Sequence, residues 1–410
     1  MIVREYIKEF EKLGFGMFVH FGAYSAIGCG EWVKEIHQYS DEAYLPYVQG
    51  FNPDKNWAKE LVSTAKKAGC KYVTLTTRHH DGFSLFDTCG LNEYDSVHTC
   101  GRDVVREFVD ECNAQGIVPF FYHTLLDWWH PDFNTDFKSY LKYLRDSVGL
   151  LCKNYGKIGG IWFDGMWSKP NEDWEEDALY GLIRSYQPTA MIINNTGLSA
   201  RGELGHIELD SVTFERGKPG AINMEGAPKY VASEMCQTMN EHWGFAKNDF
   251  CYKSLASLIE DFCVCRRFGS NFLLNVGPMG NGLLRPLDKA MLEEIGRWAK
   301  INEEALYLPR PCEVTEISKP CDFLLKNGNV YYLFCQQLPM VASIDVQLNV
   351  DANFIDTFAF DKKIKSITWL DEPSKSLAYT ENGDGTVTVN SEAYRYGTHL
   401  VARVAKIVTE

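Results

Sequence analysis

The sequence predicts an α/β protein in which a TIM-type (β/α)8 barrel is followed by an antiparallel β-sandwich. From residue 15 to about residue 305, short apolar runs alternate with longer segments of helical period, which is the pattern of repeated βα units around a parallel sheet. After Leu308-Pro309-Arg310-Pro311 the chain changes to short alternating segments separated by turn signals, which is typical of a small β-sandwich. We therefore expect two domains, a barrel over residues 1–309 and a sandwich over residues 310–410.

Eight candidate strands precede residue 280, a number that suits a closed parallel barrel. Each is a short, mainly apolar run bounded by turn or helix signals. They are Met17–Phe21, Lys71–Thr76, Ile117–Tyr122, Gly160–Asp164, Ala190–Asn194, Asp210–Glu215, Ser233–Cys236 and Asn271–Val276.

Helical segments lie between these strands and end at the expected terminators. Gly116, Gly156 and Gly269 follow three of them, and Pro188 stops a fourth, because glycine closes a helix and proline cannot continue one. The expected helices are Trp57–Ala68, Arg102–Gln115, Thr135–Tyr155, Trp174–Tyr186, Lys253–Phe268 and Pro286–Ala305. The expected sandwich strands include Val330–Phe334, Ile364–Leu370 and Thr386–Val389.

Charge and composition exclude several classes of partner. The 410 residues include 41 basic and 55 acidic side chains, for a formal net charge of −14, and no stretch is rich in lysine or arginine, so nucleic acid is not expected as a partner. Charged residues interrupt the N-terminal segment, and no later run approaches about 18 apolar residues, which predicts a cytoplasmic protein with no membrane partner. A homo-oligomer is left open.

Thirteen cysteines are an odd number and show no zinc-like spacing. This usage indicates reduced, mostly buried thiols rather than disulfides or a structural metal. The sequence also has no glycine-rich phosphate loop. We expect neither a cofactor nor a metal.

Side chains that carry chemistry gather at the ends of the first four predicted strands, where a βα barrel places its reactive residues. Asp164 ends an otherwise apolar strand, and an unpaired carboxylate there costs several kcal/mol to desolvate, so it is either held by partners or placed for chemistry. A helix-capping role is the alternative, which the following Gly165 disfavours. The other candidates are His20, Glu31, Trp32, His79, His80, His123 and Trp162.

The adjacent His79 and His80 allow two interpretations. With His20 and His123 they could form a three-ligand zinc site. Adjacent residues of an extended segment point in opposite directions, however, and no H-E-x-x-H spacing is present. Hydrogen bonding to substrate hydroxyls is the favoured interpretation, and a structural role for one of the two histidines stays an alternative.

Tryptophan, histidine and acidic side chains at strand ends predict a pocket for a neutral, polyhydroxylated ligand. Sugar faces stack on aromatic rings, while hydroxyls bond to imidazole and carboxylate. Hydrolysis of a sugar needs a second carboxyl group beside Asp164. Sequence spacing does not decide among the candidates, which are Glu208, Asp210, Glu215, Glu225 and Glu234.

Seven segments in order resemble the retaining α-L-fucosidases of glycoside hydrolase family 29. They are HFGAYS, GEW, YVTLTTRHHDGFSLFDT, GRDVV, GGIWFDGMW, SEMCQTMNEHWGF and NFLLNVGPMGNG, and the likeness extends from about residue 14 to residue 306. It implies a barrel, often distorted, with a β-sandwich after it, and hydrolysis of terminal α-L-fucosyl residues by double displacement without a metal. By the same resemblance, Asp164 in WFDG is the nucleophile, and the sugar contacts are His20, Glu31, Trp32, His79, His80, His123 and Trp162.

The acid/base of this family falls in a variable region. The usual Trp-Glu pair appears here as Ser233-Glu234, and the Cys, Asn and Trp-Gly-aromatic pattern that follows favours Glu234 over Glu215. Arg216 is the candidate sugar-binding arginine, and Trp243 of the same pattern is expected to contact substrate. The alternatives are an exo-glycosidase for a related sugar such as an α-L-galactoside, a catalytically silent sugar-binding barrel, and metal-assisted hydrolysis. Linkage preference is left open.

Overall fold

The computed structural model describes residues 2–195, 200–222, 224, 227–340 and 354–410. Two compact units make up the chain, Met1–Lys253 with Ser270–Glu293, and Ser254–Gly269 with Glu294–Glu410. These units are groups of residues that contact one another, and they are not the predicted domains. The predicted domain boundary between residues 309 and 310 therefore stays a prediction.

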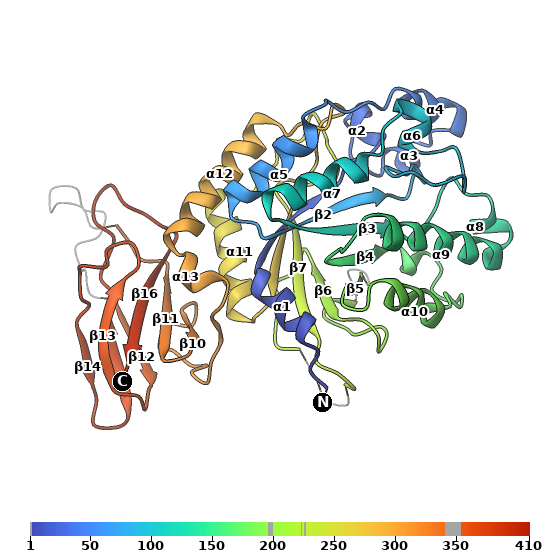
Figure 1. Ribbon diagram of the computed structural model, residues 1–410. Helices are drawn as coiled ribbons and strands as arrows, with labels where there is room; N and C mark the ends of the chain where they lie inside the picture. The colour runs from blue at the N-terminus through green and yellow to red at the C-terminus, as the bar shows by residue number, and fades with distance from the viewer. Residues whose placement is uncertain (1, 196–199, 223, 225–226, 341–353) are drawn as a thin grey trace. The chain divides into compact units, whose positions relative to one another are not determined.

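Eight parallel strands pair in sequence order, and β1 pairs with β8 to close a barrel (Figure 1). The predicted fold class is therefore confirmed, with all eight strands present. The strands are β1 Phe15–Val19, β2 Tyr72–Arg78, β3 Val118–Thr124, β4 Gly160–Asp164, β5 Met191–Asn194, β6 Ser211–Glu215, β7 Ala232–Thr238 and β8 Asn271–Val276. Two of them, β4 and β8, have the predicted bounds.

Helices α5, α7, α9 and α10 lie outside the ring of strands (Figure 1). The helices are α1 Glu5–Leu13, α2 Tyr24–Ile27, α3 Val33–Ile36, α4 Asp41–Gln49, α5 Trp57–Ala68, α6 Ser96–Cys100, α7 Val104–Gln115, α8 Asp132–Thr135, α9 Phe137–Asn154, α10 Glu176–Tyr186, α11 Leu255–Arg267, α12 Pro286–Ile301 and α13 Glu303–Leu306, with a short 3-10 turn at Met166–Ser168. The helix predicted over 286–305 is thus two helices. Asn302 separates them, since its side-chain amide donates to the carbonyl of Trp298 and competes with the backbone hydrogen bonds of a continuous helix.

The barrel interior is filled by alternate residues of the strands. Phe120 and Tyr122 of β3 and Trp162 of β4 belong to one buried apolar cluster, because side chains two apart on a strand share a face. Ile7 and Phe10 of α1 join this cluster and cover the amino ends of the strands. The opposite, carboxyl ends are left to form the site.

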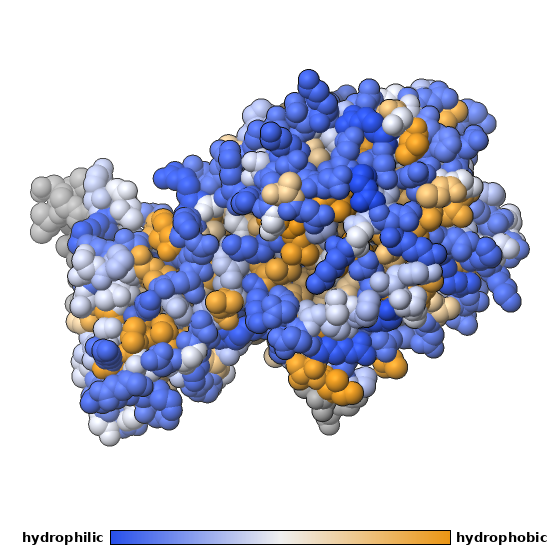
Figure 2. Space-filling view, viewed as in Figure 1, coloured by the Kyte–Doolittle hydropathy of each residue, from blue (hydrophilic) through white to orange (hydrophobic). Residues whose placement is uncertain are grey.

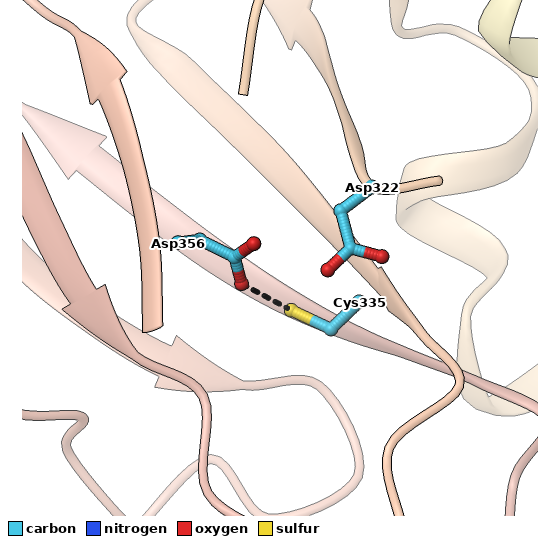
Figure 3. A group of neighbouring side chains, drawn as sticks. All are labelled: Asp322, Cys335 and Asp356. Carbon is cyan, nitrogen blue, oxygen red and sulfur yellow. Dashed lines mark hydrogen bonds between the residues drawn. The ribbon is translucent and has the colours of Figure 1, made fainter. Parts of the chain in front are cut away.

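The second unit contains two antiparallel sheets. One has the order β13-β16-β11-β10-β9 and the other β12-β15-β14. The strands are β9 Arg310–Pro311, β10 Phe323–Asn327, β11 Val330–Gln336, β12 Ile355–Ala359, β13 Ile364–Trp369, β14 Tyr379–Glu381, β15 Thr386–Asn390 and β16 Ala402–Thr409. In this unit Asp322, Cys335 and Asp356 are buried together, and one ligand atom from each lies within 4.8 Å of the others (Figure 3).

The face of the molecule in Figure 2 is mainly hydrophilic, with apolar side chains in small separate groups. Among the described residues, none of the helices combines the length and the apolar composition that crossing a bilayer requires.

Candidate active site

A pocket of about 480 Å³ opens at the carboxyl ends of the barrel strands. Its walls combine aromatic rings, imidazoles and carboxyl groups, the set expected for a polyhydroxylated ligand. The lining residues are Phe18, His20, Glu31, Trp32, His79, His80, Tyr122, Trp162, Asp164, Trp167, Asn195, Glu215, Cys236 and Trp243.

Asp164 is the last residue of β4, and its carboxyl group projects into this pocket. Tyr122 donates from its hydroxyl to Oδ2 at 3.1 Å. Oδ1 accepts from Trp167 Nε1 at 3.3 Å and from Asn195 Nδ2 at 3.2 Å. Three donors, from β3, from the turn after β4 and from the residue after β5, therefore hold this carboxyl group in one orientation, as a nucleophile requires.

Glu215, the last residue of β6, is the second carboxyl group of the pocket. Its Oε2 accepts from Asn195 Nδ2 at 2.7 Å, and the same nitrogen donates to Asp164 Oδ1 at 3.2 Å. These two oxygens are therefore at most about 6 Å apart, compatible with the roughly 5 to 5.5 Å of retaining glycosidases. Burial raises the pKa of Glu215, and the nearby charge of Asp164 raises it further, which favours the protonated form that an acid catalyst needs.

His20 follows β1, and its neighbours determine its tautomer. Asn275 donates from Nδ2 to the carbonyl of Trp243 at 2.7 Å, so its Oδ1 faces His20 Nδ1 at 2.6 Å and accepts from it. Burial lowers the pKa of His20 to about 3. The imidazole is therefore neutral, and its unprotonated Nε2 is free to accept a hydrogen bond from a ligand hydroxyl.

His79 and His80 both line the pocket, although adjacent residues of a strand face opposite sides. They follow an irregularity in the pairing of β2 with β3 between Thr76 and Arg78, and they lie beyond the end of β2, where strand alternation no longer applies. Burial lowers the pKa of His80 to about 4 and the pKa of His79 well below its ordinary value. His80 Nε2 is 3.5 Å from Asp164 Oδ2.

Aromatic rings form the walls of the pocket. Trp32 lies nearly parallel to Trp167 with ring centroids 6.0 Å apart. On another side, Trp243 packs against His20 at 5.3 Å and carries the Arg216 guanidinium over its ring at 5.2 Å. Arg216 itself does not line the pocket, and its Nη2 donates to the carbonyl of Glu241 at 2.6 Å.

Glu31 adds a third carboxyl group to the pocket. Its Oε2 accepts from the backbone nitrogen of Gly244 at 2.7 Å. A Cβ at Gly244 would lie 2.9 Å from the Glu31 nitrogen, so the absence of a side chain at this position permits the close approach. The other oxygen of Glu31 is available for a ligand hydroxyl.

Glu234, the predicted acid/base, lies in the barrel interior and does not line the pocket. It is 1% exposed, its Oε1 accepts from Trp162 Nε1 at 3.0 Å, and its Oε2 accepts from the Tyr72 hydroxyl. Burial raises the pKa of Glu234 to about 7. Both oxygens are thus occupied by protein donors, away from the space that a ligand would fill.

His123 was expected to contact the sugar, but its ring points away from the pocket. Nδ1 bonds with the Thr124 carbonyl at 2.7 Å and Nε2 with the Ser147 hydroxyl of α9 at 2.8 Å. The reason is strand alternation on β3: because Tyr122 faces inward, His123 faces the surrounding helices. Burial lowers the pKa of His123 to about 3, and it acts as a buried structural residue.

Two of the remaining acidic candidates, Asp210 and Glu208, do not line the pocket. Asp210 precedes β6 and pairs with Arg184 and Lys229, and Glu208 lies within 4.0 Å of the same two cations. Both therefore take part in ion pairs near the amino end of β6. Glu225 lies outside the described residues.

Phe18 and Cys236 line the pocket without having been predicted as site residues, and the same is true of three residues that donate hydrogen bonds to Asp164: Tyr122, Asn195 and Trp167. Each of these three had a signal in the sequence, since Tyr122 and Asn195 lie at or directly after a predicted strand end and Trp167 follows Asp164 by three. Residue type alone does not distinguish a phenol or an amide that orients a carboxyl group from the other polar side chains at strand ends.

A parallel barrel that holds two carboxyl groups at this spacing, within a pocket of imidazole and indole rings, defines a retaining glycoside hydrolase. The α-L-fucosidase family model matches residues 2–304. The chain belongs to the α-L-fucosidase family.

Relatives of known name agree with this membership. The tissue α-L-fucosidase of Mus musculus is 28% identical over 79% of this chain and 77% of its own, and the α-L-fucosidase of Dictyostelium discoideum is 26% identical over 80% and 78%. The solved structure of α-L-fucosidase isoenzyme 1 from Paenibacillus thiaminolyticus is 27% identical, covers 99% of each chain and has a TM-score of 0.80. An α-L-fucosidase GH29 from Bacteroides thetaiotaomicron, 21% identical with 99% and 95% covered, shares the fold at a TM-score of 0.82.

Proposed function

We propose that this enzyme removes terminal α-L-fucosyl residues from oligosaccharides or glycoconjugates with retention of configuration. The observation that carries the proposal is the shared Asn195 amide, which donates to both Asp164 and Glu215 inside the pocket. A pair of carboxyl groups at this spacing has room for a glycosyl carbon between them but not for the additional water of an inverting site.

In the first step, Asp164 attacks the anomeric carbon while the bond to the leaving oxygen breaks. Glu215 donates its proton to that oxygen, so the aglycone leaves as a neutral alcohol and Glu215 becomes ionised. In the second step Glu215 takes a proton from water, the water oxygen attacks the anomeric carbon, and the bond to Asp164 breaks. The products are fucose and the enzyme in its starting protonation state.

The hydroxyl groups of a fucosyl unit find hydrogen-bond acceptors in this pocket. His20 offers an acceptor at Nε2, and Glu31 has one carboxylate oxygen left over from its bond to Gly244. The rings of Trp32 and Trp243 provide apolar faces for the sugar. A site built from buried polar groups rejects epimers strongly, because a misplaced hydroxyl leaves such a group unpaired.

Glu215 is the better supported acid/base. It lines the pocket, whereas both oxygens of Glu234 accept from protein donors inside the barrel. The assignment of Glu234 from sequence stays a prediction, and the two assignments differ in a measurable way. Removal of the true acid/base spares substrates with activated leaving groups and slows those with poor ones.

The test uses azide as an external nucleophile with an aryl α-L-fucoside. Wild-type enzyme is expected to hydrolyse the fucoside. Asp164→Gly should hydrolyse the fucoside about 10³-fold more slowly than wild type, or slower still. With azide present it should form β-L-fucosyl azide, because azide takes the place of the missing carboxylate. Glu215→Ala should form α-L-fucosyl azide, because azide then attacks the glycosyl-enzyme from the opposite face.

Glu234→Ala is the matched comparison for Glu215→Ala. We expect no azide rescue in Glu234→Ala, since removal of a buried group opens no path to the anomeric carbon. The absence of fucoside hydrolysis by wild-type enzyme would overturn the proposed function. Formation of α-L-fucosyl azide by Glu234→Ala but not by Glu215→Ala would return the acid/base role to Glu234.

A further inference from the structure

Glu234 occupies an unusual position for a carboxyl group. It projects from the middle of β7 into the barrel interior, where Ala232 and Cys236 of the same strand belong to the apolar cluster. Burying a carboxyl group costs free energy unless hydrogen bonds compensate. Here the two compensating donors come from strands other than β7, Tyr72 on β2 and Trp162 on β4.

Trp162 links this buried group to the reacting groups. Its ring lines the pocket while its Nε1 donates to Glu234 Oε1 at 3.0 Å. Tyr122 lies nearly parallel to Trp162, with ring centroids 5.9 Å apart and 20° between the planes. The hydroxyl of Tyr122 in turn donates to Asp164 Oδ2 at 3.1 Å.

Trp162 also precedes Asp164 by two residues on β4, so both side chains face the barrel interior. A rotation of the indole would therefore disturb both the pocket wall and the tyrosine that orients the nucleophile. The indole N–H is a strong donor, and leaving it buried without an acceptor is unfavourable. An acceptor fixed at one place in the barrel selects one orientation of the ring.

We propose that Glu234 is a positioning residue: anchored by Tyr72, it fixes the orientation of Trp162 and through it the geometry of the fucosyl pocket and of Asp164. This role rests on the proposed function and deepens it. It assigns to Glu234 no proton transfer to the substrate. Its carboxyl group acts across the barrel, from β7 to β4, on a side chain that touches the sugar.

Both protonation states of Glu234 can perform this task. The ionised form accepts from Trp162 and Tyr72. In the protonated form the carbonyl oxygen still accepts from Trp162, and the acid proton is donated to the tyrosine oxygen, which can act as acceptor. Glutamine reproduces the protonated form, since its carbonyl oxygen accepts from Trp162 and its NH₂ donates to Tyr72. Leucine has a similar size and offers no acceptor.

The experiment compares Glu234→Gln with Glu234→Leu on an activated aryl fucoside and on a fucoside with a poor leaving group. We expect Glu234→Gln to stay within about threefold of wild type on both substrates. Glu234→Leu should lose about 10- to 100-fold in kcat/KM on both, the cost of a misplaced site, with KM raised and kcat lowered. Ser233→Ala, the neighbouring position on β7, is the matched control and should change neither constant.

A double-mutant cycle isolates the Trp162 link. Trp162→Phe removes the N–H that needs an acceptor, so Glu234→Leu should cost little further kcat/KM in that background. Binding of a fucose-configured iminocyclitol, measured by calorimetry, should weaken in Glu234→Leu and persist in Glu234→Gln. This binding measurement is independent of turnover, so it tests the positioning role even if the wild type fails to hydrolyse fucosides.

Three results would overturn the proposal. The first is a Glu234→Gln variant as inactive as Glu234→Leu, with the larger loss on the poor leaving group, which is the signature of an acid catalyst. The second is a folded Glu234→Leu variant with unchanged kcat/KM and unchanged inhibitor affinity. The third is full additivity of Glu234→Leu and Trp162→Phe. If Glu234→Leu does not fold, the near-normal rate expected of Glu234→Gln on the poor leaving group still decides between the two roles.

Discussion

At the scale of single residues, the Asn195 amide determines how two carboxyl groups share the pocket. Its two N–H bonds are directed to Asp164 and Glu215, and its Oδ1 accepts from the Thr213 hydroxyl at 3.2 Å. That third contact sets the orientation of the amide, so the NH₂ group is the side that faces the carboxyl groups. Asn195 therefore aligns the proposed nucleophile, Asp164, and the proposed acid, Glu215, with a single side chain.

We expect Asn195→Ala to shift the alkaline limb of the pH profile of kcat/KM to higher pH. The hydrogen bond from Asn195 lowers the pKa of Glu215, because a donor stabilises the ionised form. Without it Glu215 keeps its proton to higher pH, and the acid form that catalyses the first step persists. We also expect kcat/KM at the optimum to fall by roughly 10- to 100-fold.

Asn194→Ala is the control for that shift, because Asn194 donates to the Tyr180 hydroxyl at 3.0 Å and does not line the pocket. It should leave the alkaline limb in place. An alkaline limb that does not move in Asn195→Ala would contradict the assignment of Glu215 as the acid.

Residue types and strand ends indicated much of this site, and strand alternation explains why His123 lies outside it. Asp164 and His20 line the pocket as predicted because each ends or follows an apolar run, and Trp162, which the family resemblance implied, lines it as well. His123 is one residue away from the inward-facing Tyr122, and one residue reverses the face of a strand. Glu234 faces the barrel interior, as a pocket residue must, but it lies too far from the carboxyl ends of the strands to line the pocket. Its distance from those ends depends on the register between strands, which no local sequence pattern encodes.

At the scale of elements, the turn after β4 positions Asp164, the proposed nucleophile. Gly165 follows Asp164 with φ of 99°, and a Cβ there would lie 2.7 Å from Leu126 Cβ and 2.8 Å from the Leu126 nitrogen. The Leu125 nitrogen donates to the Asp164 carbonyl at 2.7 Å. The loops after β3 and β4 are therefore in direct contact at Asp164, the proposed nucleophile.

Gly165→Ala should lower both stability and kcat. We expect a loss of about 1 to 3 kcal/mol in the free energy of unfolding, from backbone strain and from the contact with Leu126, and a decrease in kcat of about 10-fold or more as Asp164 shifts. Thermal unfolding and fucoside kinetics measure the two effects.

Gly116→Ala is the matched control, since Gly116 has φ of 72° and nothing lies within 4 Å of its Cβ position. This substitution should cost about 1 kcal/mol through strain alone and leave kcat unchanged. Equal kinetics in Gly165→Ala and wild type would show that the turn does not position the nucleophile.

Most elements were predictable because their signals are local. The helix Trp57–Ala68 has its predicted bounds, and Gly69 ends it with φ of 94°, as expected for a left-handed helix terminator. The irregularity at the end of β2, which brings His79 and His80 to one side, was not predicted. A register shift between neighbouring strands depends on both strands at once.

At the scale of the whole molecule, a pair of buried carboxyl groups makes stability depend on pH. Asp322 accepts from the Gln336 nitrogen at 2.7 Å, and Asp356 accepts from the Ser391 hydroxyl at 2.6 Å. Figure 3 shows the two carboxyl groups on either side of Cys335. Burial and the charge of Asp356 raise the pKa of Asp322 to about 6.

A raised carboxyl pKa means that the folded state binds the proton more tightly than the unfolded state. The free energy of unfolding therefore falls as the pH rises from about 4, the pKa of an aspartate in the unfolded chain, to about 6, the pKa of Asp322 in the folded state. Above that pH the loss of stability is complete. Asp356→Asn removes one charge and should stabilise the protein by roughly 1 to 3 kcal/mol at pH 8, with little change at pH 4.

The check is the thermal midpoint of the full chain at pH 4 and pH 8 with EDTA present, so that no metal ion bridges the three side chains of Figure 3. Asp361→Asn, an exposed aspartate of the same unit with 81% side-chain exposure, should behave as wild type. If the thermal midpoint of Asp356→Asn equals that of wild type at both pH values, the predicted dependence of stability on the ionisation of Asp322 is contradicted.

The sequence by itself determined the barrel, the order of its strands and the chemical character of the pocket, because apolar periodicity and strand-end residues are local features. Only the tertiary structure decided which carboxyl group faces Asp164. That choice depends on how far each strand is shifted along its neighbours around a closed ring, and such a shift places Glu215 at the mouth of the barrel and Glu234 beneath Trp162.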